Sequence, residues 1–175
     1  MYAHLLRRSL VLFTITLAFG LGLPARGQET KFDMVQLIAK NPGNNPHSFT
    51  GTWLVQTQIT NCLGTPTENF SKFLSIHAGG TANEISNSLP PSQRTTAFGV
   101  WQPLHEGNFV YALRFFRFTP AGTFASTVQA KWSVSLDQEG DSYTAEGAIQ
   151  VFAPNGTVIA NLCGTETGTR MVIPD

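Results

Sequence analysis

Few side chains in this sequence have the types and spacing of a catalytic site. His77 and Glu84 flank a short turn, where they could form an acid/base pair. Such a pair needs burial to bring its pKa values toward neutrality, so we favour the alternative that both are solvated residues near a turn. The sequence contains no Gly-x-Ser-x-Gly, no phosphate-binding glycine-rich loop and no His-Glu-x-x-His. Hydrolase and nucleotide chemistry therefore have no support, and we expect no cofactor.

Arg114 is the best candidate for a polar anchor in a binding site. It stands in RFFRFTPAGTF, residues 114–124, among aromatic residues that indicate a strand running into a hairpin. An unpaired buried guanidinium costs several kcal/mol, so an inward Arg114 would need an anion. A fatty or aromatic carboxylate could supply a bidentate partner. An outward Arg114 would be an ordinary surface charge.

The direction of Arg114 depends on the hairpin turn that follows it. A three-residue loop with a left-handed Gly122 pairs Thr119 with Thr123 and, counted back, places Arg114 opposite Val128 on the apolar face. A four-residue loop turns Arg114 outward, since a slip of one residue exchanges the two faces. The outward direction also agrees with the apolar residues at alternate positions of this strand, which are Phe109, Tyr111, Leu113 and Phe115. The sequence leaves both registers open.

Alternation of apolar and polar residues dominates the chain after residue 49. In TFASTVQAKWSVSL, residues 123–136, the even positions are mostly apolar, which is typical of a strand with one wet face. The same pattern predicts about eight strands, near 51–61, 70–77, 81–86, 96–102, 108–118, 123–136, 142–152 and 157–172. Short turns connect most of them, so we predict an all-β fold, an up-and-down antiparallel barrel whose closure removes exposed edges.

The aromatic residues of these strands are the strongest sign of a binding cavity. Trp53, Tyr111, Trp132 and Tyr143 share the apolar faces of their strands, and we predict them, with Arg114, as ligand-binding residues. In an eight-stranded barrel such side chains either fill the interior or line a pocket for one small ligand. Small residues on the same faces, Ala130, Ala145 and Gly147, leave room, but the sequence does not decide between packing and a pocket.

The N-terminal region indicates export. Residues 1–27 combine Arg7 and Arg8 with an apolar run and then Ala25-Arg26-Gly27, which is the pattern of a signal peptide. We predict a signal peptide at 1–27, an N-terminal arm with a short helix at 28–48 and the barrel domain at 49–175. The protein is then secreted or periplasmic, without stable membrane insertion after signal removal. Loss of the signal changes the net charge from 0 to −3, which makes nucleic acid a poor partner.

Export also determines what the two cysteines are expected to do. Cys62 and Cys163 are the only cysteines, and in an oxidising compartment they are expected to form a disulfide. The chain has no CxxC motif, and its histidines outside the signal peptide lack metal-ligand spacing. We therefore expect no metal.

Three residues at the two ends of the predicted barrel carry a family resemblance. Gly51-Thr52-Trp53 opens the first strand, and Arg170 stands near the end of the last. This arrangement resembles the lipocalins and the wider calycin group, whose barrel opens with Gly-x-Trp and whose final strand carries a basic residue over that tryptophan. The resemblance implies structural roles for Gly51, Trp53 and Arg170.

We expect the protein to bind a small apolar or amphipathic molecule in the barrel. One alternative is a cofactor-free cyclase or isomerase resembling allene oxide cyclases and dirigent proteins, which His77, Glu84 or Glu146 in the cavity with Tyr111 would favour. A second alternative is a filled barrel that acts as a surface interaction module through exposed aromatic residues. The sequence leaves the oligomeric state open.

Overall fold

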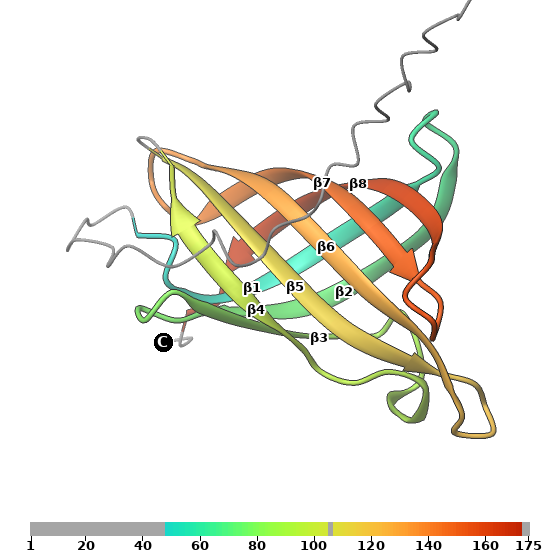
Figure 1. Cartoon of the computed structure of the whole chain (residues 1–175). Coiled ribbons are helices and arrows are strands. Elements are labelled where there is room, and N and C mark those ends of the chain that lie inside the picture. Colours follow the sequence, from blue (N-terminus) through green and yellow to red (C-terminus); the bar gives the residue numbers. More distant parts are fainter. Residues whose placement is uncertain (1–47, 105–106, 173–175) are drawn as a thin grey trace, which may run out of the picture. The chain divides into compact units, whose positions relative to one another are not determined.

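The computed structural model describes residues 48–104 and 107–172 (Figure 1). The predicted signal peptide lies outside the described residues, as does the predicted arm apart from Ser48. The elements are β1 (Gly51–Thr60), β2 (Pro66–Ile76), β3 (Thr81–Ser86), the 3-10 turn η2 (Pro91–Gln93), β4 (Ala97–Pro103), β5 (Asn108–Phe118), β6 (Phe124–Leu136), β7 (Ser142–Phe152) and β8 (Val158–Arg170). The described residues contain no α-helix.

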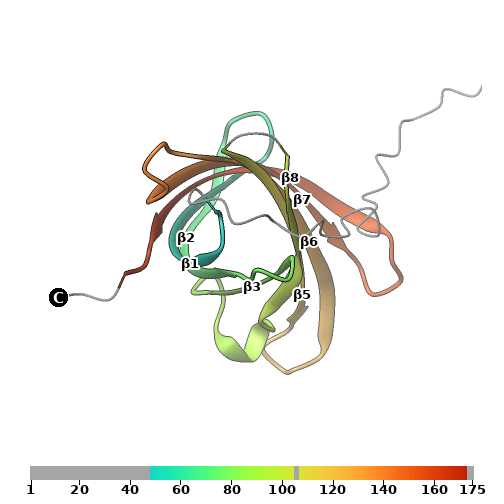
Figure 2. The ribbon, with the colours of Figure 1, turned by 90° about the vertical axis from the view of Figure 1, so that its left-hand side faces the viewer.

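The eight strands form a closed antiparallel barrel in sequence order. Each strand pairs with the next, and β1 closes the ring against β8 from Trp53↔Arg170 to Thr60↔Cys163. Figure 2 shows the strands encircling one central axis. The predicted up-and-down barrel is therefore confirmed, and closure gives each of the eight strands a paired neighbour on both sides.

The strand boundaries follow the sequence alternation closely, except at β2. This strand begins at Pro66 rather than near residue 70, and its first four residues are exposed. When both faces of a strand are exposed to solvent, apolar and polar residues do not alternate along it, so the sequence carries no strand signal. Its pairing with β1 comes from the backbone register, in which Ile59 lies opposite Glu68.

A β-bulge decides the direction of Arg114. The predicted three-residue turn is present, because Thr119 N donates to Thr123 O at 2.8 Å and Gly122 has φ +82°. One strand residue later the register shifts between Arg117 and Phe118, so that Arg114 lies opposite Gln129 instead of Val128. The extra residue reverses the faces. Arg114 consequently points outward, is exposed and donates to the Gln129 side-chain oxygen.

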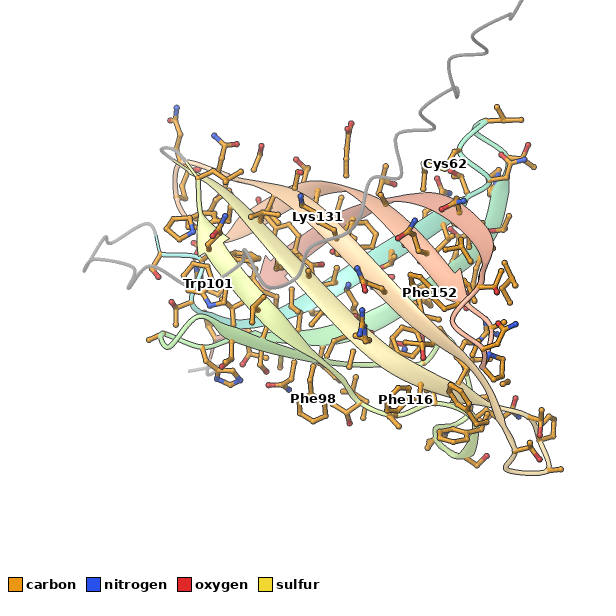
Figure 3. All side chains as sticks on the ribbon, in the orientation of Figure 1. Cys62, Phe98, Trp101, Phe116, Lys131 and Phe152 are labelled. Carbon is orange, nitrogen blue, oxygen red and sulfur yellow. A yellow bond between two sulfur atoms is a disulfide. The ribbon has the colours of Figure 1, made fainter. Side chains whose placement is uncertain are left out.

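Aromatic side chains fill one end of the barrel. Phe49 stacks on Phe109 with ring centroids 5.2 Å apart and meets Tyr143 edge-on at 5.4 Å. Trp53 and Tyr143 are 5.1 Å apart, and Trp101 closes the cluster against Phe49. All five are buried. Figure 3 places Trp101 at this end and Phe152 at the other.

Two inward glycines make room for the largest rings. A Cβ added to Gly147 would lie 2.3 Å from the Trp132 ring, and one added to Gly168 would lie 2.1 Å from the Tyr143 ring. The rings therefore lie flat across neighbouring strands. The space that the sequence suggested beside Gly147 is occupied by Trp132 itself.

Two contacts hold the first and last strands of the barrel together. The Cys62–Cys163 disulfide is present and links the segment after β1 to β8 across a sequence separation of 101. Arg170 lies over the Trp53 ring at 4.2 Å and donates to the carbonyl oxygens of Thr50 and Gly140, both at 2.7 Å. The cation and the ring thus hold the first and last strands together beside Gly51.

Candidate functional site

The end of the barrel opposite the aromatic cluster is hollow. A cavity of about 340 Å³ opens there, which lies within the size range of small-ligand sites. Its apolar walls come from six strands and include Ile59, Phe70, Phe115, Val128, Trp132, Val151 and Leu162. Most inward residues on β6, β7 and β8 at this end are aliphatic or small, whereas rings fill the other end. This difference in side-chain volume explains why the barrel is packed at one end and hollow at the other.

Ionic side chains form the floor of the cavity. Lys72 on β2 places its Nζ 3.3 Å from Glu84 Oε2 on β3 and also bonds to Glu166 Oε1 on β8. The Lys72 Nζ lies 3.2 Å from the Tyr111 hydroxyl and 5.0 Å from the centre of the Trp132 ring. The Lys72 and Glu166 side chains are 1% and 0% exposed, and Glu84 is 8% exposed. The floor is thus a paired, nearly dry charge cluster.

Glu166 collects hydroxyl donors from three strands. Tyr111 and Tyr143 both donate to Glu166 Oε2, the latter at 3.3 Å. Thr57 donates to Glu166 Oε1, also at 3.3 Å. Together with Lys72 these bonds satisfy a carboxylate that has no contact with water, as a buried acid requires.

Arg94 carries the β3–β4 connection across the mouth of the cavity. Its guanidinium donates to Glu84 Oε1 at 2.8 Å and to the hydroxyls of Ser86 and Ser88, the latter at 3.0 Å. It also lies 4.1 Å from the centre of the Phe115 ring. This one side chain therefore links the connection to the floor and to the cavity wall.

The two carboxylates of the floor have opposite pKa shifts. Burial raises the pKa of Glu84, but Lys72 and Arg94 outweigh burial and lower it from the ordinary value. Burial raises the pKa of Glu166, and Lys72 offsets this only in part while Glu84 adds repulsion. Burial also raises the pKa of Tyr111 and Tyr143 well above their ordinary values, and Glu166 adds to the shift. Both tyrosines are therefore neutral donors.

Two further charged residues line the mouth. Glu68 on β2 and Arg117 on β5 both border the cavity, and each is placed inward by the alternation of its strand. Burial raises the pKa of Glu68, while Arg117 and then Arg94 act to lower it. These charges mark the boundary between the apolar walls and solvent.

The structure separates the five predicted ligand-binding residues. Trp132 lines the cavity. Trp53, Tyr111 and Tyr143 are buried in the packed end or in the floor cluster. Arg114 lies on the outer face, because of the bulge, and does not reach the interior.

We predicted that His77 and Glu84 are both solvated, and this prediction is wrong for Glu84. His77 is exposed and its Nε2 lies 2.6 Å from Asn83 Oδ1. Glu84 is buried, because it follows the inward alternation of β3 with Ala82. Glu146 is exposed on β7. Of the three proposed acid/base residues, only Glu84 borders the cavity, where it shares Lys72 with Tyr111.

Sequence reasoning missed the remaining charged residues of the interior. Lys72 has the parity of Phe70 and Leu74 on β2, and this alternation was the available signal. Glu166 stands between the inward glycines Gly164 and Gly168, so its face of β8 has no apolar pattern to follow. Charged residues are rarely buried unless paired, and the pairing joins strands that are distant in sequence.

The outer face of the barrel carries a small apolar patch. Leu54, Phe73 and Ile85 lie side by side across β1, β2 and β3 and are 43%, 48% and 58% exposed. Phe98 is 67% exposed and points away from the barrel, as Figure 3 shows. The patch is compatible with an interaction surface, but the interior of the barrel is not filled throughout.

Comparison with known proteins adds no family assignment. No protein-family model matches this sequence, and no curated protein is similar enough to match it. Residues 48–104 and 107–172 include no helix with the length and hydropathy of a membrane span.

Proposed function

We propose that the protein binds one small apolar or amphipathic molecule in the hollow end of the barrel. The observation that carries this proposal is the cavity of about 340 Å³ with apolar walls and a charged floor. Burial of apolar ligand surface against Phe70, Phe115 and Trp132 supplies the affinity, at about 25 cal/mol per Å² of surface removed from water.

Two further observations support a lipocalin-like carrier in an oxidising compartment. Arg170 lies over Trp53 next to Gly51, which is the arrangement that the lipocalin resemblance implies. The Cys62–Cys163 disulfide is typical of secreted and periplasmic proteins. We propose export on these grounds, together with the signal-like N-terminus.

Native mass spectrometry of the protein purified from its own host tests the proposal. Ala130 lines the cavity, so Ala130→Phe places a ring inside it. Ala148 is exposed on β7, so Ala148→Phe adds the same ring outside. A small adduct is expected on the wild type and on A148F and is expected to be lost from A130F. Bare wild-type protein, or an adduct that A130F retains, would contradict the proposal.

A second candidate function is proton transfer on a bound substrate, as in a cofactor-free isomerase. Glu84 favours it, since this carboxylate borders the cavity beside Arg94, Lys72 and the Tyr111 hydroxyl. Lys72 and Arg94 lower the pKa of Glu84 and so weaken it as a base, but the same two cations would stabilise the negative charge that develops on a substrate from which Glu84 takes a carbon-bound proton. The test is deuterium incorporation, in heavy water, into the molecule recovered from the host. Exchange that Glu84→Gln abolishes supports catalysis, and no exchange supports carriage alone.

A further inference from the structure

We infer that the ligand carries a single carboxylate and that Arg117 binds this group at the mouth of the cavity. The inference rests on the proposed function, because it names the chemical class of the molecule that the hollow end accepts. It also replaces Arg114, the anchor predicted from the sequence, with Arg117. Arg117 lies three residues later on β5 and faces inward, whereas Arg114 faces outward.

The charges of the floor have partners within the protein. Lys72 contacts both Glu84 and Glu166, and Arg94 contacts Glu84. A ligand anion placed among them would have to displace a carboxylate from a nearly dry site, which costs several kcal/mol. The ionic floor therefore closes the cavity and is a poor site for a ligand headgroup.

Arg117 differs from the cations of the floor. It lines the cavity and is half-buried. Its backbone pairs with Ser126 and bridges to Arg94, but its guanidinium forms no hydrogen bond or ion pair with any other described residue. Glu68 borders the same cavity, and Arg117 acts electrostatically to lower the pKa of Glu68, but these two described side chains form no ion pair. A guanidinium offers a planar fork that matches a carboxylate in two parallel hydrogen bonds. Arg117 is thus the cation of the cavity with free capacity to bind an anion.

The positions of Arg117 and Phe115 define how such a ligand lies. Both side chains point inward on β5, with Phe115 one step deeper. An amphiphile bound through its carboxylate at Arg117 therefore extends its apolar part past Phe115 toward Trp132. Only the headgroup remains near solvent, so the molecule enters tail first and loses little hydration of its charge.

Glu68 sets the strength of this site. Its carboxyl group borders the same mouth, and the positive charge of Arg117 acts to lower its pKa. An ionised Glu68 competes for Arg117 and repels a ligand carboxylate. Removal of the Glu68 charge is therefore expected to strengthen anion binding, whereas removal of the Arg117 charge weakens it.

The test compares decanoate with 1-decanol as competitors of the neutral fluorescent probe N-phenyl-1-naphthylamine at pH 7.5. Arg117→Gln is expected to weaken decanoate binding by about tenfold or more, as loss of a charge-assisted pair does, and to leave 1-decanol within about twofold. Glu68→Gln is expected to strengthen decanoate binding by a few fold. Arg114→Gln makes the same charge change on the outer face of the same strand and is expected to change neither ligand.

Two outcomes would overturn the inference alone, and a third would overturn the proposed function with it. Equal losses in R114Q and R117Q would attribute the effect to overall charge and overturn the inference. Equal binding of decanoate and 1-decanol by the wild type would also overturn it, while probe binding would leave the proposed function standing. If the probe itself does not bind the wild type, the proposed function fails together with the inference.

Discussion

At the scale of single residues, the interior charges separate into two groups with different roles. Lys72, Glu84, Arg94 and Glu166 neutralise one another across the barrel. A buried pair of this kind contributes less to stability than its geometry suggests, but removal of one partner leaves an uncompensated charge. Arg117 and Glu68 stand apart at the mouth, where water and a ligand can reach them.

Glu84→Gln tests the charge cluster through its pH dependence. The pKa of Glu84 lies below the ordinary value of 4.5 in the folded protein, so the folded state binds this proton less tightly than the unfolded chain does. The stability that Glu84 contributes is therefore present above about pH 4.5 and is lost as the pH falls through the folded pKa.

Urea unfolding at pH 6 and pH 3 measures this contribution. The variant is expected to be less stable than the wild type by about 3 to 5 kcal/mol at pH 6, with a gap that narrows at pH 3. A gap that stays constant or widens on acidification would contradict the lowered pKa of Glu84.

Gly147→Ala tests the packing of Trp132. The added methyl would lie 2.3 Å from the ring, so the ring must move, at an expected cost of about 1 to 3 kcal/mol. Gly79→Ala is the control, because nothing lies within 4 Å of its added Cβ and its φ is not positive. Equal unfolding midpoints for both variants would show that the ring does not depend on Gly147.

At the scale of elements, the bulge on β6 reconciles two sequence signals that conflicted. The turn residues Thr119 to Thr123 predicted one register and the apolar parity of β5 predicted the other, and each is correct on its own side of the bulge. The strands themselves could be predicted because alternation is a local property. The bulge and the charge pairs could not, because both depend on which side chains meet across strands.

The disulfide is the element-scale restraint with the largest expected effect. It closes a sequence separation of 101 residues between the end of β1 and β8, for which the chain-entropy model gives about 4 to 5 kcal/mol. The double variant Cys62→Ala, Cys163→Ala is expected to lose a comparable free energy of unfolding in urea. A loss below about 1 kcal/mol would show that the eight-strand closure alone constrains the chain.

At the scale of the whole barrel, one end is packed with side chains and the other end is hollow. The sequence left a packed interior and a binding pocket as alternatives, and the structure assigns one to each end, since Phe49, Trp53 and Tyr143 occupy the first and the cavity the second. The alternation in the sequence predicted which residue types face inward at both ends of the barrel. It did not predict their distribution, which follows from where Phe49 inserts and where Trp132 lies.

Titration with N-phenyl-1-naphthylamine tests the central claim most directly. The wild type is expected to bind one equivalent with enhanced probe fluorescence, Ala148→Phe to bind alike, and Ala130→Phe to bind at least about tenfold more weakly because its ring occupies the cavity. Thermal unfolding of the three proteins verifies that each is folded. Absence of saturable binding by the wild type, or equal binding by A130F, would contradict a ligand site in the hollow end of the barrel.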